Sequence, residues 1–209
     1  MKILNVKDLS IAGVKIIRFG RFGDNRGYFT ETFKQTDVLE NPDLAFLKPY
    51  TFVQSNESFS KKGVVKGLHF QWQPPLGKLL RTISGHMVDM ILDIRKNSPT
   101  LGKIILYDLP TNTSQEYSEW IWIPPGMAHG SFFLEDSINE YFFTANYNPK
   151  AEAGISPLAG DLDWSLADAG LKKHFEILKQ GEILISPKDK DGVSFGDWQK
   201  DERSANFHV

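Results

Sequence analysis

Apolar and polar residues alternate in short runs along most of the chain, and Gly, Pro, Asn and Asp separate the runs. A period of two residues is typical of a β-strand with one buried face, because successive side chains of a strand point to opposite sides. The runs with this pattern are GVKIIRF, GYFTETF, TFVQSNES, VVKGLHFQW, KLLRTISG, HMVDMILDIR, GKIILYDL, EWIWIPP, GSFFLED and NEYFFTANY. Many short strands with frequent turn residues predict an all-β sandwich or barrel.

A helical period of about 3.6 residues appears in one segment, SLADAGLKKHFEILKQG, where Leu171, Phe175 and Leu178 fall on one face. This segment follows the predicted strands. We therefore expect a single domain with a β core over about residues 13–164, followed by a helix and tail over residues 165–209. The last residues, DERSANFHV, are expected to form a solvated tail.

The composition is typical of one globular domain. Of the 209 residues, 41% are hydrophobic, which is enough to bury a full core. The 24 Lys and Arg residues nearly balance the 26 Asp and Glu residues, and no basic run is present that could neutralise a nucleic-acid backbone. The absence of cysteine excludes disulfides, thiolate metal sites and thiol nucleophiles. The first residues, MKILNVKDLS, lack the apolar region of a signal peptide, and no segment is long enough to span a bilayer. We expect a soluble, cytoplasmic protein that binds neither nucleic acid nor membrane.

Several predicted strands carry polar side chains on the face opposite their apolar one. In GVVKGLHFQW, residues 63–72, Leu68 and Phe70 lie on one face and His69 on the other. An ordinary antiparallel sheet with one solvated side would explain each such strand alone. Taken together, the strands favour a small barrel whose polar mouth is a ligand cavity. The polar side chains concerned are His69, Gln71, Asp89, Asp93, Arg95 and Tyr141.

His69 is the best candidate for a general base, because an unperturbed imidazole has a pKa of about 6.5 and accepts a proton near neutral pH. Tyr141 could return the proton as an acid. A phenol with a pKa near 10 donates well only to a strong base such as a carbanion or enolate, so this pair indicates chemistry at a carbon next to a carbonyl. Lys78 could stabilise the enolate oxygen as a cation.

Two further ligand sites are open at this stage. Arg26, Lys66 and Arg81 could hold a phosphate, although basic residues on strands are usually just solvated. The segment PPGMAH, Pro124 to His129, looks like the P-x-G-x-x-H of metal-binding cupins. The other metal ligands of those cupins are missing, because GLHFQ has one His followed by Gln where they have an H-x-H pair. We therefore expect no metal.

Taken in order, these segments resemble the dTDP-4-dehydrorhamnose 3,5-epimerase family, the RmlC-like cupins, which epimerise 4-keto-6-deoxy sugar nucleotides. The resemblance runs from about Gly13 to Trp164 and returns at LISPKDKDG. Each motif alone is weak, whereas their order and spacing are specific. The motifs are D-x-R-G-x-F-x-E from Asp24, Q-x-N-x-S from Gln54, G-L-H-F-Q from Gly67, K-L from Lys78, D-M-I-L-D-I-R-x-x-S-P-T from Asp89, P-x-G-x-A-H-G from Pro124 and Y-x-x-T-x-x-Y-x-P from Tyr141.

The resemblance implies a cupin-type jelly roll, or double-stranded β-helix barrel, with a short C-terminal helical segment. His69 matches the base that removes a proton beside the C4 ketone, Tyr141 the acid on the opposite face, and Lys78 the lysine near the enolate oxygen. No metal or organic cofactor is implied, and the partners are a nucleotide-diphosphate 4-keto sugar and a second subunit of a homodimer. The substrate-binding residues expected on this basis, some of them reaching the neighbouring subunit, are Arg26, Phe29, Glu31, Gln54, Asn56, Lys66 and His129. The polar strand faces add Gln71 and Asp89.

The chain departs from the family pattern at three places. Lys66 replaces the usual Arg, which keeps the charge but loses the bidentate grip on a phosphate. Ala159 stands where we expect the aspartate that orients the base histidine, so Asp161 or Asp89 could serve His69 instead, or the base works unaided, with slower or single-centre epimerisation. The predicted helix is longer than the usual connection, and is either a surface insertion or part of the rim of the sugar pocket.

The favoured activity is a cofactor-independent epimerase that inverts C3, C5 or both in a nucleotide-linked 4-keto sugar. A 3,4-ketoisomerase would share the fold and the enolate but move the carbonyl. A metal-dependent cupin oxygenase or isomerase would contain metal after purification. A sugar-nucleotide binder without activity is a further alternative, and the loss of the aspartate at Ala159 is the argument for it.

Overall fold

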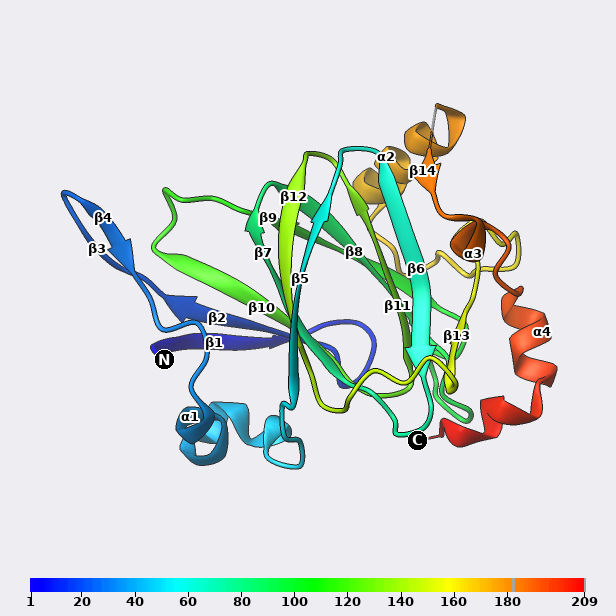
Figure 1. Ribbon diagram of the computed structural model, residues 1–209, viewed down its shortest axis with the longest axis horizontal. Helices are drawn as coiled ribbons and strands as arrows, with labels where there is room; N and C mark the ends of the chain where they lie inside the picture. The colour runs from blue at the N-terminus through cyan, green and yellow to red at the C-terminus, as the bar shows by residue number, and fades with distance from the viewer. Residues whose placement is uncertain (182, 209) are drawn as a thin grey trace.

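Two β-sheets packed face to face form the body of the protein in the computed structural model, which describes residues 1–181 and 183–208 (Figure 1). The first sheet has the strand order β1 (Ile3–Asp8), β2 (Lys15–Gly20), β10 (Tyr117–Ile123), β7 (Lys78–Ser84), β12 (Ser137–Phe143) and β5 (Gln54–Ser60). The second sheet has the order β13 (Glu152–Gly154), β6 (Val64–Gln71), β11 (Met127–Phe133), β8 (His86–Asp93) and β9 (Ile104–Pro110), and β14 (Leu184–Ile185) pairs with β6 in parallel. The arrangement confirms the predicted all-β jelly roll.

The space between the sheets is filled with aliphatic and aromatic side chains over most of its length. Leu80 and Ile121 of the first sheet pack there with Met87, Ile91 and Phe133 of the second. These residues alternate along their strands with residues of the outer faces, as the period of two predicts. A group of polar residues on the inner faces, among them His69, Lys78 and Tyr141, lies at one end of the barrel.

The outer face of each sheet is apolar as well, and helices cover it. On the first sheet, α1 (Gln35–Glu40) and the 3-10 helix η1 (Pro42–Leu47) pack over Leu79, Trp120 and Trp122. On the second sheet, Phe175 of α2 (Ala169–Gln180) and Trp198 of α4 (Phe195–Lys200) pack on the apolar face. The segment that follows α2 contains α3 (Pro187–Lys190), α4 and the 3-10 helix η2 (Glu202–Asn206). The last three lie beside β6 and β13, as Figure 1 shows.

This cover explains the two faces of β6. Leu68 and Phe70 are buried on the outside of the barrel, beneath the C-terminal segment, where the Phe70 ring lies 4.5 Å from that of Trp198. His69, between them, therefore points into the barrel. The apolar side of the strand contacts the C-terminal segment, and its polar side lines the interior.

Residues 201–208 are not a solvated tail, so that expectation is wrong for them, and its last residue, Val209, lies outside the described residues. Phe207 is only 3% exposed, and its ring packs on Phe70 and Trp198. Its backbone oxygen accepts a hydrogen bond from the Lys96 N–H. The run DERSANFHV looked solvated because polar residues stand on either side of its single aromatic residue, whose partners lie in β6 and α4.

The predicted helix is confirmed as α2. Phe175 is fully buried and packs against Phe132 and Trp164 on the outer face of the second sheet. This position supports the surface insertion rather than a part of the pocket rim. Among the described residues, no helix has the length and the apolar character needed to cross a bilayer.

A separate two-stranded hairpin, β3 (Phe22–Asp24) and β4 (Gly27–Phe29), projects from the body at the end opposite β6 (Figure 1). Its aromatic side chains are exposed to an unusual degree: Phe22 by 52%, Tyr28 by 45% and Phe29 by 67%. Exposed aromatic clusters of this kind are typical of interaction surfaces.

Candidate active site

A cavity of about 220 Å³ opens between the two sheets at the polar end of the barrel. A neighbouring cavity of about 110 Å³ shares His69, Lys78 and Phe143 with it and adds Gln71, Tyr147 and Glu152. The predicted base, acid and lysine therefore line one space. The residues around the larger cavity are Asn56, Ser58, Lys66, His69, Lys78, His129, Gly130, Ser131, Tyr141 and Phe143.

A β-bulge in β6 brings Lys66 and His69 to the same cavity. His129 of β11 pairs with His69, but Ser131 pairs with Lys66, so β6 contains one extra residue in this interval. Gly67 fits here because its φ is +98° and a Cβ would lie 2.5 Å from the Cα of Gly130. Strict alternation would have placed Lys66 on the face of Leu68. Burial lowers the pKa of the Lys66 ammonium, and nearby Asp189 partly offsets this effect.

His69 has a carboxylate partner. Its Nε2 lies 2.6 Å from Oδ1 of Asp189, in α3. Ser186 caps this helix and accepts the Asp189 N–H, which fixes the short turn against β6. Burial by itself would raise the pKa of the Asp189 carboxyl, but the hydrogen bond and charge of His69 hold it below its ordinary value. With its proton held on Nε2, the neutral imidazole presents the lone pair of Nδ1 as the basic atom.

Neither of the two alternatives considered for this role is correct. Asp161 accepts the backbone N–H groups of Phe195 and Gly196 at the start of α4. Asp89 bonds to the other histidine of the cavity. The loss of an aspartate at Ala159 therefore does not leave the base without a carboxylate, and the signal for Asp189 was the matching segment LISPKDKDG.

Lys78, His129 and Asp89 form a buried chain of hydrogen bonds along the cavity wall. The Lys78 Nζ lies 3.3 Å from Nδ1 of His129, whose Nε2 lies 2.7 Å from Oδ1 of Asp89. Ser131 donates to the same carboxylate oxygen at 3.0 Å. Burial lowers the pKa of His129, which favours a neutral ring that accepts from Lys78 and donates to Asp89. Asp89 is fully buried behind His129.

Burial also affects the ammonium of Lys78 and the phenol of Tyr141. Desolvation lowers the pKa of Lys78 to about 8, although Asp89 and Glu152 favour the charged form. Desolvation raises the pKa of Tyr141 to about 12, against a hydrogen bond from the Ser58 hydroxyl at 3.3 Å. Near pH 7 the site therefore holds a cation and a neutral phenol.

Tyr141 and His69 approach the cavity from different sheets. Tyr141 lies on β12 of the first sheet, between β7 and β5, and His69 on β6 of the second. A flat substrate bound between them would have the imidazole on one side and the phenol on the other.

A second charged group beside His69 was missed in the sequence. The Glu152 carboxylate accepts from the Tyr147 hydroxyl at 2.8 Å and from the Lys188 Nζ at 2.7 Å. Burial would raise the pKa of Glu152, but these two hydrogen bonds lower it overall. Lys188 directly precedes Asp189, so α3 contributes to both carboxylate contacts. The signal was the Lys-Asp pair in LISPKDKDG.

The remaining predicted residues of this end lie around Tyr147. Gln54 donates to Oδ1 of Asn56 at 3.0 Å and accepts the Tyr147 backbone N–H at 2.9 Å. Asn56 lines the larger cavity. The amide of Gln71 bonds to the backbone on either side of Tyr147.

Arg26, Phe29 and Glu31 do not join the cavity of their own chain. They lie on or just after the projecting hairpin, at the far end of the molecule from β6 (Figure 1). Arg26 pairs with Asp24 at 2.6 Å, and Glu31 lies 3.3 Å from the N-terminal ammonium.

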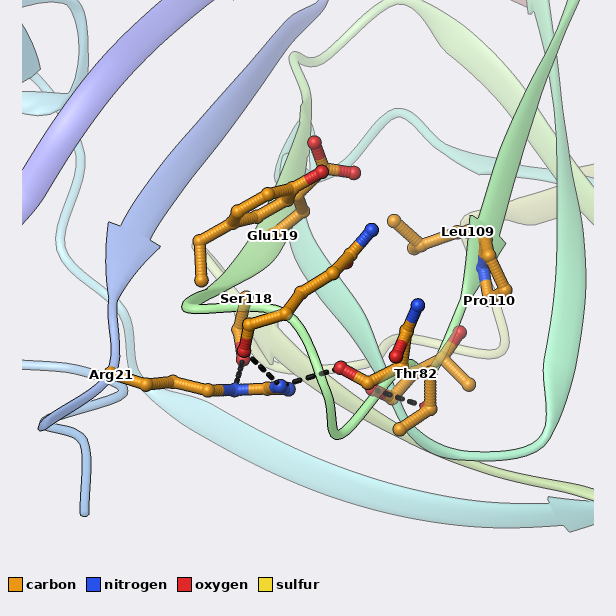
Figure 2. A pocket seen from close by; sticks show the side chains of 10 residues that line it. Arg21, Thr82, Leu109, Pro110, Ser118 and Glu119 are labelled. Atoms are coloured by element: carbon orange, nitrogen blue, oxygen red, sulfur yellow. Dashed lines mark hydrogen bonds between the residues drawn. The ribbon is translucent and has the colours of Figure 1, made fainter. Parts of the chain in front are cut away.

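A different cavity, of about 30 Å³, is drawn in Figure 2. The cation of this cavity is the Arg21 guanidinium, which donates to the backbone oxygens of Asn112 and Gln115 and to the Ser118 hydroxyl. Because this cation is already bonded within the chain and the space is small, the His69 cavity is the better candidate for the active site. Among the described residues, no group of three or more His, Asp or Glu side chains converges as metal ligands do.

Known proteins of one kind match the chain over nearly its whole length. The family model described as dTDP-4-dehydrorhamnose 3,5-epimerase matches residues 8–197. The dTDP-4-dehydrorhamnose 3,5-epimerase of Shigella flexneri is 37% identical over 93% of this chain and 97% of its own length. That of Methanothermobacter thermautotrophicus is 37% identical over 87% of this chain and 89% of its own.

A solved structure shows the same similarity in three dimensions. The crystal structure of dTDP-6-deoxy-D-glucose-3,5-epimerase from Legionella pneumophila Philadelphia 1, in complex with dTDP-4-keto-L-rhamnose, superposes with a TM-score of 0.76. It is 33% identical, and the match covers 92% of this chain and 93% of that one. Sequence, fold and extent of the match agree, and the chain belongs to the dTDP-4-dehydrorhamnose 3,5-epimerase family.

Proposed function

We propose that this protein epimerises a dTDP-linked 4-keto-6-deoxy sugar at C3 and C5 through an enolate, with no organic cofactor. The observation that carries the proposal is the placement of His69 and Tyr141 on opposite sheets of one cavity, beside the buried ammonium of Lys78. An imidazole on one side and a phenol on the other is what inversion of a carbon requires.

The first step breaks a C–H bond next to the C4 ketone. Nδ1 of His69 accepts the proton, and the electron pair moves through the forming C=C bond onto the ketone oxygen. The Asp189 carboxylate, at 2.6 Å from Nε2, stabilises the imidazolium that results. The Lys78 ammonium stabilises the negative oxygen of the enolate.

The second step delivers a proton to the opposite side of the same carbon. The Tyr141 hydroxyl gives up its proton, the ketone forms again, and the carbon is inverted. Ser58 donates to the phenol oxygen and so stabilises the phenolate that remains. Exchange with solvent returns a proton to Tyr141 and removes one from His69.

His129 and Asp89 support this chemistry from behind Lys78. A neutral His129 that accepts from Lys78 holds the ammonium in place without competing for positive charge. Asp89 in turn fixes the His129 ring through Nε2.

The nucleotide end is completed by a second subunit in this proposal. Arg26, Phe29 and Glu31 are matched to nucleotide and diphosphate contacts, yet their hairpin points away from the cavity of their own chain. A homodimer that inserts each hairpin into the other subunit would bring the partner subunit's Arg26 toward Lys66, Gln54 and Asn56. The exposed aromatic side chains of the hairpin support this arrangement.

Proton NMR in heavy water tests the reaction. With dTDP-4-keto-6-deoxyglucose, the signals at C3 and C5 should both disappear as deuterium enters, and an epimerised product should form. His69→Asn should abolish both effects. Exchange that persists in this variant would rule out His69 as the base, and a product with a 3-keto group would indicate the ketoisomerase.

Subunit complementation tests the hairpin. If sites are shared, His69→Asn and Arg26→Ala subunits form mixed dimers with one intact site, so an equal mixture regains roughly a quarter of wild-type activity. Each variant alone stays inactive. A mixture without regained activity would contradict a shared site.

The alternative of a binder without activity has lost its main support. It rested on the absence of a carboxylate for the base at Ala159, whereas Asp189 is in contact with His69.

A further inference from the structure

Gln71 lies at the end of β6, two residues after His69 and on the same side of the strand, and is only 4% exposed. Its Nε2 donates to the backbone oxygens of Pro74 at 3.0 Å and Asn146 at 3.2 Å. Its Oε1 accepts the Asn148 N–H at 2.7 Å. Both amide protons are thus used within the chain, so donation of a hydrogen bond to a substrate would break an existing one.

These bonds hold the segment on both sides of Tyr147. Residues 145–151, between β12 and β13, lie outside the strands, and Asn146 and Tyr147 are exposed, so this turn depends on side-chain hydrogen-bond partners to keep one conformation. Gln71 provides them before and after Tyr147, and Gln54 accepts the Tyr147 N–H itself at 2.9 Å. The side-chain amide of Asn148 closes the turn by donating to the Gln73 oxygen at 2.8 Å.

The Tyr147 side chain connects this turn to the surroundings of His69, the proposed base. Its ring lines the cavity shared with His69 and Lys78, and its hydroxyl donates to Glu152 at 2.8 Å. Glu152 also binds Lys188, the residue before Asp189. A turn held in place therefore defines one wall of the space beside His69.

We infer that Gln71 is a positioning residue, which fixes the Asn146–Asn148 turn so that Tyr147 forms the wall of the sugar cavity next to His69. This role replaces the direct substrate contact expected for Gln71, and it rests on the proposed epimerase function. It differs from the roles of His69 and Tyr141, because Gln71 acts on the substrate only through Tyr147.

A double-mutant cycle tests this inference with the proposed substrate. Gln71→Met has a similar length but no hydrogen bonds, and kcat/KM should fall by about 10- to 100-fold, because small displacements in an active site are costly. In a Tyr147→Ala background, Gln71→Met should lower kcat/KM by less than about threefold, because the Tyr147 ring through which Gln71 acts is absent. Gln73→Met, an exposed glutamine two residues along, is the matched control and should match wild type.

A conservative variant separates positioning from loss of folding. In Gln71→Glu, a protonated carboxyl still donates to one backbone oxygen, whereas a carboxylate would repel both. Its activity relative to wild type at the same pH should therefore rise as the pH falls. The inference would be overturned if Gln71→Met lowered kcat/KM by the same factor in the Tyr147→Ala background as in wild type. It would also be overturned if kcat/KM of Gln71→Met lay within about twofold of wild type.

Amide hydrogen exchange gives a readout without substrate. The Asn148 N–H should exchange faster in Gln71→Met than in wild type or Gln73→Met, because its acceptor has been removed. Unchanged exchange would refute the positioning role. A wild-type protein that fails to turn over the sugar would refute the proposed function instead, and exchange at Asn148 would still decide whether Gln71 holds the turn.

Discussion

The carboxylate of Asp189 lies 2.6 Å from Nε2 of His69, although 120 residues separate the two in sequence. The contact joins a bulged strand of the barrel to a helix of four residues in the C-terminal segment. Because the carboxylate holds a proton on Nε2, the imidazole has a defined basic atom at Nδ1.

Asp189→Asn should lower kcat by about 100-fold or more, because an amide can donate to Nε2 and so favours the wrong tautomer of His69. Stopped assays of product formation, or NMR exchange at C3 and C5, measure the loss. Asp161→Asn is the control and should stay within about twofold of wild type, since Asp161 only caps α4. Equal losses in both variants would argue against a role for Asp189 at the base.

Tyr141→Phe should separate the two proton transfers. His69 remains able to remove a proton and return it to the same side, so deuterium should still enter the substrate while inversion falls by about 100-fold or more. Parallel measurement of deuterium content and product stereochemistry checks this. Tyr50→Phe, on the outer face of the first sheet, should behave like wild type. If Tyr141→Phe inverts the carbon at a normal rate, another group is the acid.

Activity should fall above pH 8. Burial lowers the pKa of Lys78 to about 8, so the ammonium is present below that pH and is lost as the pH rises through it. We expect log(kcat/KM) to decline above pH 8 because the enolate oxygen loses its cation. Lys78→Arg should be slower overall but lack this decline, since a guanidinium keeps its proton. A decline near pH 8 that persists in Lys78→Arg would assign it to another group.

The lowered pKa of Lys78 also affects stability, which should increase with pH where activity declines. Between pH 8 and the ordinary lysine pKa of 10.5, the unfolded chain binds more protons at Lys78 than the folded chain does. The contribution of this residue to the free energy of unfolding therefore increases with pH over that window. Denaturation at several pH values, compared between wild type and Lys78→Met, isolates it.

Phe207→Ala should lower the free energy of unfolding by about 3 kcal/mol, as for other buried phenylalanines, because it leaves a cavity between Phe70 and Trp198. The kcat of the folded variant should stay near that of wild type, since Phe207 lies on the outer face of the second sheet. Urea unfolding followed by tryptophan fluorescence measures the change. Asn206→Ala, an exposed neighbour, should have an effect within about 0.5 kcal/mol. If the free energy of unfolding of Phe207→Ala equals that of wild type, the expectation of a solvated C-terminal tail would be supported instead.

Local patterns were sufficient to predict most of the strands, with β1, β13 and β14 among those missed, and the inward direction of His69 and Tyr141, because a period of two residues decides the face of a side chain. The place of Lys78 came from the family resemblance, since an exposed strand lysine was the simpler interpretation. The bulge at Gly67 was not predictable from that period, since an extra residue leaves no mark on composition, and it alone puts Lys66 beside His69.

Contacts between distant segments were the other limit. Asp189 and Phe207 lie in short, mostly polar stretches, and both depend on how the C-terminal segment packs on β6. The family resemblance identified the matching segment LISPKDKDG, but which carboxylate reaches His69 required the three-dimensional arrangement.

The parallel pairing of β14 with β6 has a consequence for biosynthesis. A ribosome makes β6 long before it makes β14 and α3, so a nascent chain can close most of its barrel while His69 still has no carboxylate. In the proposed mechanism, His69 therefore gains its carboxylate only after the segment with β14 and α3 has been made and has docked on β6.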